Sequence, residues 1–226
     1  MREIVLDTET TGIDPKSGHR LVEIGCLELD NHIPTNRTYH VYLNPERDVP
    51  AEAYEVHGLD STFLSDKPRF SDIVDSFLNF IDNASLVIHN ASFDMGFINA
   101  ELTRIGYDPL PSDRAIDTLA MAREQFPGAQ ASLDALCRRF GVDNANRTVH
   151  GALLDSQLLA DVYLELCGGR QPDLELGADQ ATPGTGMPAI GDGRAPQPPR
   201  AHAPTAEEAA AHARFLERLK EPLWWA

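Results

Sequence analysis

The stretch VLDTETTG, residues 5–12, sets two acidic side chains, Asp7 and Glu9, directly after a short apolar run. Alternate side chains of an extended strand point to the same face, so these two residues are expected on one face with their Cα atoms about 6.6 Å apart. Two carboxylates this close repel each other, and ionising both is costly unless a cation lies between them. Two interpretations are open at this point. The pair is either a solvated strand end that leads into the Thr-Thr-Gly turn or part of a cation site.

The segments that follow this strand predict an α/β domain with a mixed sheet. Alternating apolar residues predict strands at 21–29 and 37–43, which would form a meander with a first strand at 3–7. A helical, irregular segment begins at Pro50, and apolar residues at helical spacing predict a helix at 70–82. Strand and helix then alternate: a strand at 85–90, a helix closed by Gly106, a strand that passes into helix at 115–126, a helix between Ser132 and Gly141, and a long helix within 150–167. A run of strands followed by alternating strands and helices is typical of an α/β fold.

Composition and charge limit the kind of partner that this domain binds unaided. The chain has 226 residues, enough for one domain with a good core and an additional segment. Its formal net charge is −16, and residues 1–167 hold 27 Asp and Glu against 13 Lys and Arg. Proteins that hold duplex nucleic acid alone usually present a basic face. A nucleic-acid substrate would therefore need bound cations, a small footprint on the strand, or a partner that holds the DNA.

The cysteines and the N-terminal residues predict a cytoplasmic protein. Cys26, Cys137 and Cys167 are odd in number and widely spaced in apolar sequence, so they are expected to be reduced thiols in or near the core. No apolar run approaches the roughly 20 residues needed to cross a bilayer. The N-terminus has none of the features of a signal peptide, and no membrane association is expected.

The composition changes near Gly168. Residues 168–226 contain 8 of the 16 prolines and 7 of the 16 glycines, and residues 177–204 show no helical or strand period. The expected organisation is a domain at 1–167, a flexible linker at 168–204 and a tail at 205–226. Thr205 and Glu208 have capping-box spacing for a tail helix.

Asp94, His150 and Asp155 each lie close to the end of a predicted apolar element. Taken singly, each has an ordinary explanation. Asp94 suits a helix N-terminus, Asp155 an ordinary polar position on a helix, and His150 a hydrogen-bonded or exposed histidine. Their joint occurrence with Asp7 and Glu9 in an α/β domain favours one shared site.

Three segments, DTETTG at 7–12, HNASFD at 89–94 and HGALLD at 150–155, resemble in order and spacing the three motifs of the DEDD exonuclease superfamily. That superfamily has a ribonuclease H-like fold, which implies a mixed five-stranded sheet flanked by helices. The histidine five residues before Asp155 resembles the DEDDh branch, because the tyrosine branch would place Tyr at 151. The stretches RTVHGALLDSQLLADVYL and SLDALCRRFGV closely resemble the family of proofreading epsilon subunits of bacterial DNA polymerase III. The likeness covers residues 1 to about 167.

The resemblance implies a 3′ to 5′ exonuclease that removes mispaired 3′-terminal nucleotides by two-metal-ion hydrolysis. Mg²⁺ and Mn²⁺ prefer oxygen ligands, and the family's ligands correspond to four carboxylates, Asp7, Glu9, Asp94 and Asp155. His150 corresponds to the general base, since an imidazole titrates near working pH.

The resemblance also implies contacts with the 3′-terminal nucleotide. The residues expected there are Glu9, Thr10, Thr11, Glu52, His57 and Asp155. An alternative for His57 is a cap on the loop before Gly58. A frayed single-stranded DNA end needs only a few nucleotides held by backbone and stacking contacts, which relieves the charge problem.

The segment after the domain predicts protein partners. QPDLEL at 171–176 resembles clamp-binding peptides through Gln171, Leu174 and Leu176, with a frayed helix extension as the alternative. In the epsilon family the tail binds the polymerase catalytic (alpha) subunit, and a small theta-like subunit is a further expected partner. Apolar side chains at a chain end, here Leu223, Trp224 and Trp225, suit a partner's pocket. The alternative is a tail that folds back on its own domain.

Two other functions stay open from the sequence. One is an RNA-trimming exonuclease of the same superfamily, which would have no need of the long linker and aromatic terminus. The other is an inactive scaffold that bridges polymerase and clamp, against which stands the presence of all four acids and the histidine.

Overall fold

The computed structural model describes residues 1–145, 149–169 and 204–216. The chain divides into two compact units, Met1–Leu176 and Gly177–Ala226, which are described separately. The finer division into a domain at 1–167, a linker at 168–204 and a tail at 205–226 stays a prediction.

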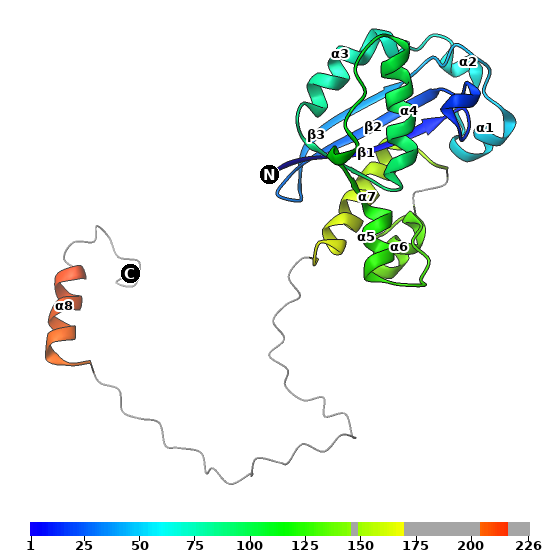
Figure 1. Ribbon diagram of the computed structural model, residues 1–226. Coiled ribbons are helices and arrows are strands. Elements are labelled where there is room, and N and C mark those ends of the chain that lie inside the picture. The colour runs from blue at the N-terminus through cyan, green and yellow to red at the C-terminus, as the bar shows by residue number, and fades with distance from the viewer. Residues whose placement is uncertain (146–148, 170–203, 217–226) are drawn as a thin grey trace, which may run out of the picture. The chain divides into compact units, whose positions relative to one another are not determined.

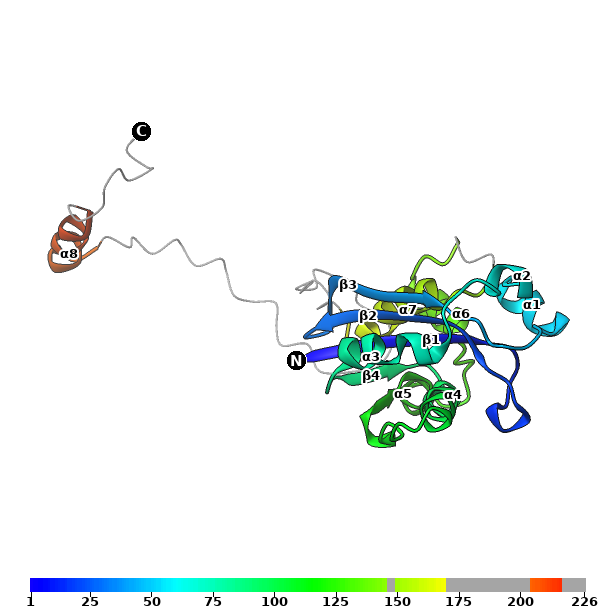
Figure 2. The same ribbon diagram turned by 90° about the horizontal axis from the view of Figure 1, so that it is seen from above.

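The first unit contains the predicted mixed five-stranded sheet, with strand order β3-β2-β1-β4-β5 (Figures 1 and 2). Strand β1 (Arg2–Thr10) pairs antiparallel with β2 (Leu21–Asp30), which pairs antiparallel with β3 (Ile33–Tyr42). On its other side β1 pairs in parallel with β4 (Ser85–Ile88), and β4 with β5 (Ala115–Asp117). The β2-β3 hairpin turns at Asn31 and His32, whose φ angles of 51° and 66° suit a tight two-residue turn.

Helices cover both faces of the sheet. They are α1 (Ala51–His57), α2 (Ser61–Leu64), α3 (Phe70–Ile81), α4 (Ala91–Arg104), α5 (Thr118–Gln125), α6 (Leu133–Phe140) and α7 (Ala152–Leu166), with short 3-10 turns at Pro15–Ser17 and Ser112–Arg114. The core on one face is built with α3 and α4, and the core on the other with α5, α6 and α7. The predicted helices at 70–82, 133–140 and within 150–167 are confirmed, and α4 begins two residues before Phe93.

Strand β1 supplies side chains to both cores. Ile4 and Leu6 pack with α3 and α4, whereas Val5 packs with α6 and α7. The same alternation sends Thr8 toward α4 and the odd-numbered acids toward α7. The predicted strand end at residue 7 is wrong, because β1 stays paired with β2 as far as Thr10. Asp7 and Glu9 are therefore held by a sheet and do not lie in a solvated turn.

The cysteine prediction is correct for two of the three residues. Cys26 and Cys137 are buried free thiols. Cys167 is exposed, because α7 ends at Leu166 and the chain leaves the core there. Among the described residues, no helix is both long and apolar enough to cross a membrane.

The second unit contains one described helix, α8 (Ala206–Leu216). The predicted capping box is present. The Glu208 amide donates to Thr205 Oγ1 at 3.2 Å, and the Thr205 amide donates to Glu208 Oε2 at 2.8 Å. No residue of α8 is buried, and the Phe215 side chain is 55% exposed.

Candidate active site

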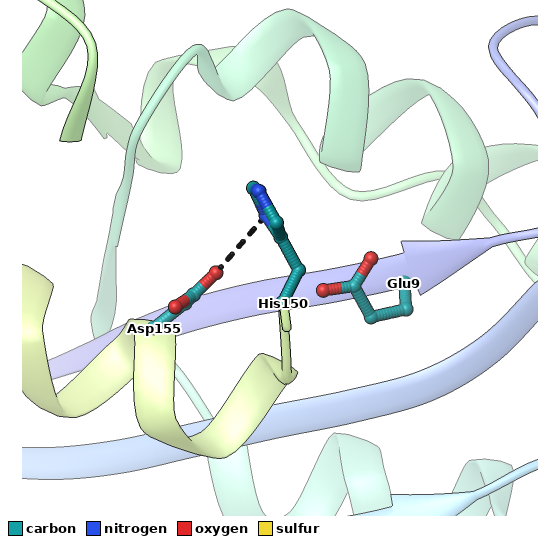
Figure 3. A group of neighbouring side chains, drawn as sticks. All are labelled: Glu9, His150 and Asp155. Atoms are coloured by element: carbon teal, nitrogen blue, oxygen red, sulfur yellow. Dashed lines mark ion pairs between the residues drawn. The ribbon is translucent and has the colours of Figure 1, made fainter. Parts of the chain in front are cut away.

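Three predicted site residues, Glu9, His150 and Asp155, bring their possible ligand atoms within 4.8 Å of one another (Figure 3). Glu9 and Asp155 are only 7% and 3% exposed, whereas His150 is exposed. The His150 Nδ1 atom lies 3.4 Å from Asp155 Oδ2. Two buried carboxylates side by side are unfavourable without a neutralising cation. The group therefore has the donors and the charge of a divalent-cation site.

A close approach between β2 and α7 brings these residues together. Gly25 lies opposite Asp7 in the antiparallel register, and a Cβ atom there would lie 2.3 Å from the Ala152 carbonyl carbon. Ser156 Oγ donates to the Gly25 carbonyl at 2.9 Å. The first turn of α7, which carries Asp155, thus rests directly on the sheet. Gly25 was not predicted as a site residue, although a glycine inside an apolar strand is a signal of close approach.

Asp94 lies in the first turn of α4 and is 2% exposed. Burial raises its pKa to about 7, although the hydrogen bond that Thr8 Oγ1 donates at 2.7 Å favours the charged form. Its ligand atoms are not part of the group around Asp155. Thr8, on the α4 face of β1, is a second residue that was not predicted.

Asp7 is half-buried and lines a cavity of about 510 Å³, here called the Arg123 cavity, together with His150 and Asp155. The remaining lining residues are His89, Asn90, Leu119, Arg123, Ala129, Ala131, Ser132, Leu133 and Asp134. His150 and Asp155 of the group in Figure 3 therefore line the same cavity as residues of helices α5 and α6.

A second cavity of about 510 Å³, here called the Thr10 cavity, receives the other predicted substrate residues. Glu9, Thr10, Thr11, Glu52 and His57 all line it, together with Thr8, Gly12, Ile13, His19, Pro50, Ala53, Val56 and Phe93. Asp155 does not line this cavity and belongs to the Arg123 cavity. Five of the six predicted substrate residues therefore line the same cavity.

His57 is 4% exposed, and burial lowers its pKa. Its Nδ1 atom accepts a hydrogen bond from the Leu59 amide at 3.0 Å, so the loop cap considered from the sequence is present. Within the described residues, the buried Nε2 atom has no hydrogen-bond partner. His57 can thus cap the loop with one ring nitrogen and offer the other to a ligand.

The Thr-Thr-Gly turn is fixed by the segment before β2. The Arg20 amide donates to Thr11 Oγ1 at 3.0 Å, and the Thr11 amide donates to the Arg20 carbonyl at 2.9 Å. The Arg20 guanidinium in turn donates to both carboxylate oxygens of Glu101, at 2.6 and 2.8 Å. A bidentate pair of this kind is geometrically specific, so α4 holds one wall of the Thr10 cavity.

Helix α1 connects the Thr10 cavity to His150. The His150 amide donates to the Val56 carbonyl at 3.0 Å, and Val56 also lines the Thr10 cavity. The segment that carries the histidine is therefore attached to a cavity wall.

The exonuclease family (RNase_T) matches residues 4–163. The DNA polymerase III subunit epsilon of Rickettsia conorii is 49% identical over 222 residues, 97% of this chain and 96% of the relative. The proteins of the same name from Salmonella typhimurium and Escherichia coli K12 are 51% and 48% identical over 176 residues, 75% of this chain and 72% of each relative.

Solved structures support the fold. The nuclease domain of 3′hExo, a DEDDh family member bound to rAMP, matches with a TM-score of 0.65 at 17% identity, over 74% of this chain and 92% of that one. Exonuclease X in complex with 5′ overhanging duplex DNA matches with a TM-score of 0.56 at 23% identity, over 73% and 90%. The predicted ribonuclease H-like fold is confirmed.

Proposed function

We propose a mechanism and a substrate for a chain that belongs to the exonuclease family and, within it, to the epsilon subunits of DNA polymerase III. As a member of that family it is a proofreading 3′ to 5′ exonuclease. We assign it the removal of mispaired nucleotides from a single-stranded or frayed DNA 3′ end. The observation that carries this assignment is the convergence of Glu9, His150 and Asp155 between two cavities, each large enough for a nucleotide.

The residues at the site fit divalent cations. Glu9 and Asp155 are buried carboxylates with ligand atoms near one another, and Asp7 lines the same cavity as Asp155. Oxygen donors of this kind suit Mg²⁺ or Mn²⁺. We assign two such cations to Asp7, Glu9, Asp94 and Asp155. When bound, they supply neutralisation of the scissile phosphate and activation of the attacking water.

His150 serves in this proposal as the general base. It is the exposed member of the group in Figure 3, and a neutral imidazole can accept a proton from water. Asp155, at 3.4 Å from Nδ1, orients the ring and stabilises the imidazolium that forms. The hydrogen bond to the Val56 carbonyl holds the backbone of His150 at the edge of the Thr10 cavity.

The Thr10 cavity is the proposed site of the 3′-terminal nucleotide. Thr10, the last residue of β1, and Thr11 line this cavity, and Glu52 and His57 line it from helix α1. Glu9 lines this cavity and is also one of the group in Figure 3. It can therefore contact the terminal nucleotide as well as a cation.

The proposal also includes protein partners, because the acidic domain offers few basic side chains to DNA. The family associates with DNA polymerase III, and we propose that the polymerase alpha subunit holds the DNA. We further propose a sliding-clamp contact through Gln171, Leu174 and Leu176, polymerase anchors at Leu223, Trp224 and Trp225, and a theta-like subunit on the domain. These six residues lie outside the described part of the chain.

Release of mononucleotides from a mispaired DNA 3′ end tests the enzyme assignment. Asp155→Asn and His150→Gln should each remove most of the activity, whereas Asp161→Asn, at an exposed position of the same helix, should keep it. Full activity of Asp155→Asn would refute the assignment. Faster cleavage of a matched RNA strand would favour the RNA-trimming alternative, and a calorimetric titration without Mn²⁺ binding would favour the inactive scaffold.

A further inference from the structure

The Arg123 cavity has no role in the function proposed so far beyond its border with the active site. It shares no lining residue with the Thr10 cavity. The group of Figure 3 connects the two, because Glu9 lines the Thr10 cavity while His150 and Asp155 line the Arg123 cavity. Both spaces therefore border the residues that act on the phosphodiester.

A phosphodiester joins two nucleotides, so cleavage at this group needs room for both. Each cavity has a volume of about 510 Å³. If the 3′-terminal nucleotide occupies the Thr10 cavity, its neighbour across the scissile phosphate must extend toward the Arg123 cavity. The next phosphate of the strand lies on the far side of that neighbour.

Arg123 differs from the arginines of this domain that pair with carboxylates. It extends from α5 into the cavity lining and is exposed, and it has no hydrogen-bond or ion-pair partner among the described residues. Arg2 and Arg37 both pair with Glu28, and Arg20 pairs with Glu101. No other Arg or Lys of the described residues lines either cavity. A guanidinium without a carboxylate partner is available to a phosphate, which it can bind with two parallel hydrogen bonds.

Two neighbours in the cavity set the conditions for this contact. Burial, and to a smaller extent the charge of Arg123, lowers the pKa of His89, which disfavours a positive charge on this ring. Asp134 adds a negative charge to the lining and accepts a hydrogen bond from Asn144 Nδ2 at 3.1 Å. Arg123 is thus the one fixed cation of the described lining that can offset repulsion between the strand and the acids of the cavity.

We propose that the Arg123 cavity holds the penultimate nucleotide of the DNA strand and that Arg123 binds the phosphate on the 5′ side of that nucleotide. The inference rests on the proposed function and extends it to a second nucleotide. Arg123 is a positioning residue, since it touches a phosphate that does not react.

Two dinucleotide substrates test the proposal with the full-length chain. A DNA dinucleotide without a 5′ phosphate fills both cavities but gives Arg123 no ligand, whereas the same dinucleotide with a 5′ phosphate supplies one. We expect the wild-type enzyme to have a KM about tenfold lower for the phosphorylated form, the effect of one charge-assisted contact. Arg123→Gln should bring the two KM values together, because neither form then has a guanidinium to bind its 5′ end.

Matched variants separate this role from a structural one. Arg138→Gln removes another exposed arginine, on α6 and outside both cavities, and should keep the tenfold preference. Arg123→Lys keeps the charge and should retain part of the preference. An unchanged preference in Arg123→Gln, or equal loss on both dinucleotides, would overturn the proposal while the exonuclease assignment stands. If the wild-type enzyme cleaves neither dinucleotide nor longer strands, the proposed function fails and this inference fails with it.

Discussion

Helices α7 and α8 belong to two regions of the chain that reach stability in different ways. Helix α7 buries side chains along most of its length against the sheet, and the same packing places Asp155 beside Glu9. Helix α8 buries none of its residues and relies on the capping box of Thr205 and Glu208. Most of a helix's stability in proteins comes from packing. Under the proposed function, catalysis belongs to the region that supplies its own core, and partner binding to the region whose described helix buries none of its residues.

The largest expected effect separates catalysis from association. Asp7→Ala should lower the rate of mononucleotide release at least about 1000-fold, because a lost ligand removes several kcal/mol of charge stabilisation in the transition state. Binding of the variant to polymerase should equal that of the wild type, measured by co-purification. A variant that loses polymerase binding as well would remove the distinction between the two regions.

The reverse change tests the tail. A chain that lacks residues 205–226 should release mononucleotides from single-stranded DNA at the wild-type rate, because all described lining residues of both cavities belong to the first unit. It should no longer co-purify with polymerase, since it lacks the proposed anchors. Co-purification of the truncated chain would contradict the assignment of the tail.

The next effect concerns the contact between β2 and α7 at Gly25. Gly25→Ala would bring a Cβ atom to 2.3 Å from the backbone of α7, which the backbone cannot relieve without moving Asp155. We expect a loss of about 3 kcal/mol in the free energy of unfolding, at the upper end for overpacking, and lower activity. Urea denaturation measures the first and mononucleotide release the second.

Gly96→Ala is the matched control for that substitution. Gly96 lies inside α4, and an added Cβ atom would have no neighbour within 4 Å among the described residues. Alanine is the better helix former, so this variant should gain up to about 1 kcal/mol. Equal behaviour of the two variants would argue against the contact between β2 and α7.

A smaller effect depends on pH in the metal-free protein. Burial raises the pKa of Asp94 to about 7 from an ordinary value of 3.8, so the folded protein binds more protons than the unfolded chain between these values. The contribution of Asp94 to stability is therefore most favourable below about pH 4 and declines as the pH rises to about 7. With EDTA present, Asp94→Asn should stabilise the protein at pH 8 relative to wild type and have little effect at pH 4.

Cations should reverse this difference. Mn²⁺ favours the charged carboxylate, so its addition at pH 8 should stabilise the wild-type protein more than Asp94→Asn. Urea denaturation of both proteins, in EDTA and in Mn²⁺, measures the two differences in stability. A wild-type protein that shows the same pH dependence as Asp94→Asn in EDTA would contradict the role given to burial.

The order of the elements and the residues of the group in Figure 3 could be predicted from the sequence. The contacts that hold these residues together could not. Asp7, Glu9 and Asp155 could be singled out because they occur together with Asp94 and His150 and their spacing has a known family pattern. Gly25 and Thr8 were not found, because a glycine or threonine in a strand is common and its partner lies far away along the chain. Arg123 was missed for the same reason, since the cavity that it lines forms only when α5 and α6 pack near α7.

The smallest expected effect returns to α8. Thr205→Ala removes the hydroxyl that accepts from the Glu208 amide and should weaken the helix by about 1 kcal/mol. If α8 must be helical to bind polymerase, the affinity should fall by about fivefold, as 1 kcal/mol requires. Mononucleotide release should not change. Thr205→Ser keeps a hydroxyl and should bind normally. An unchanged affinity in Thr205→Ala would mean that the partner forms its contact without the capped helix, and the described part of the tail would then be a spacer.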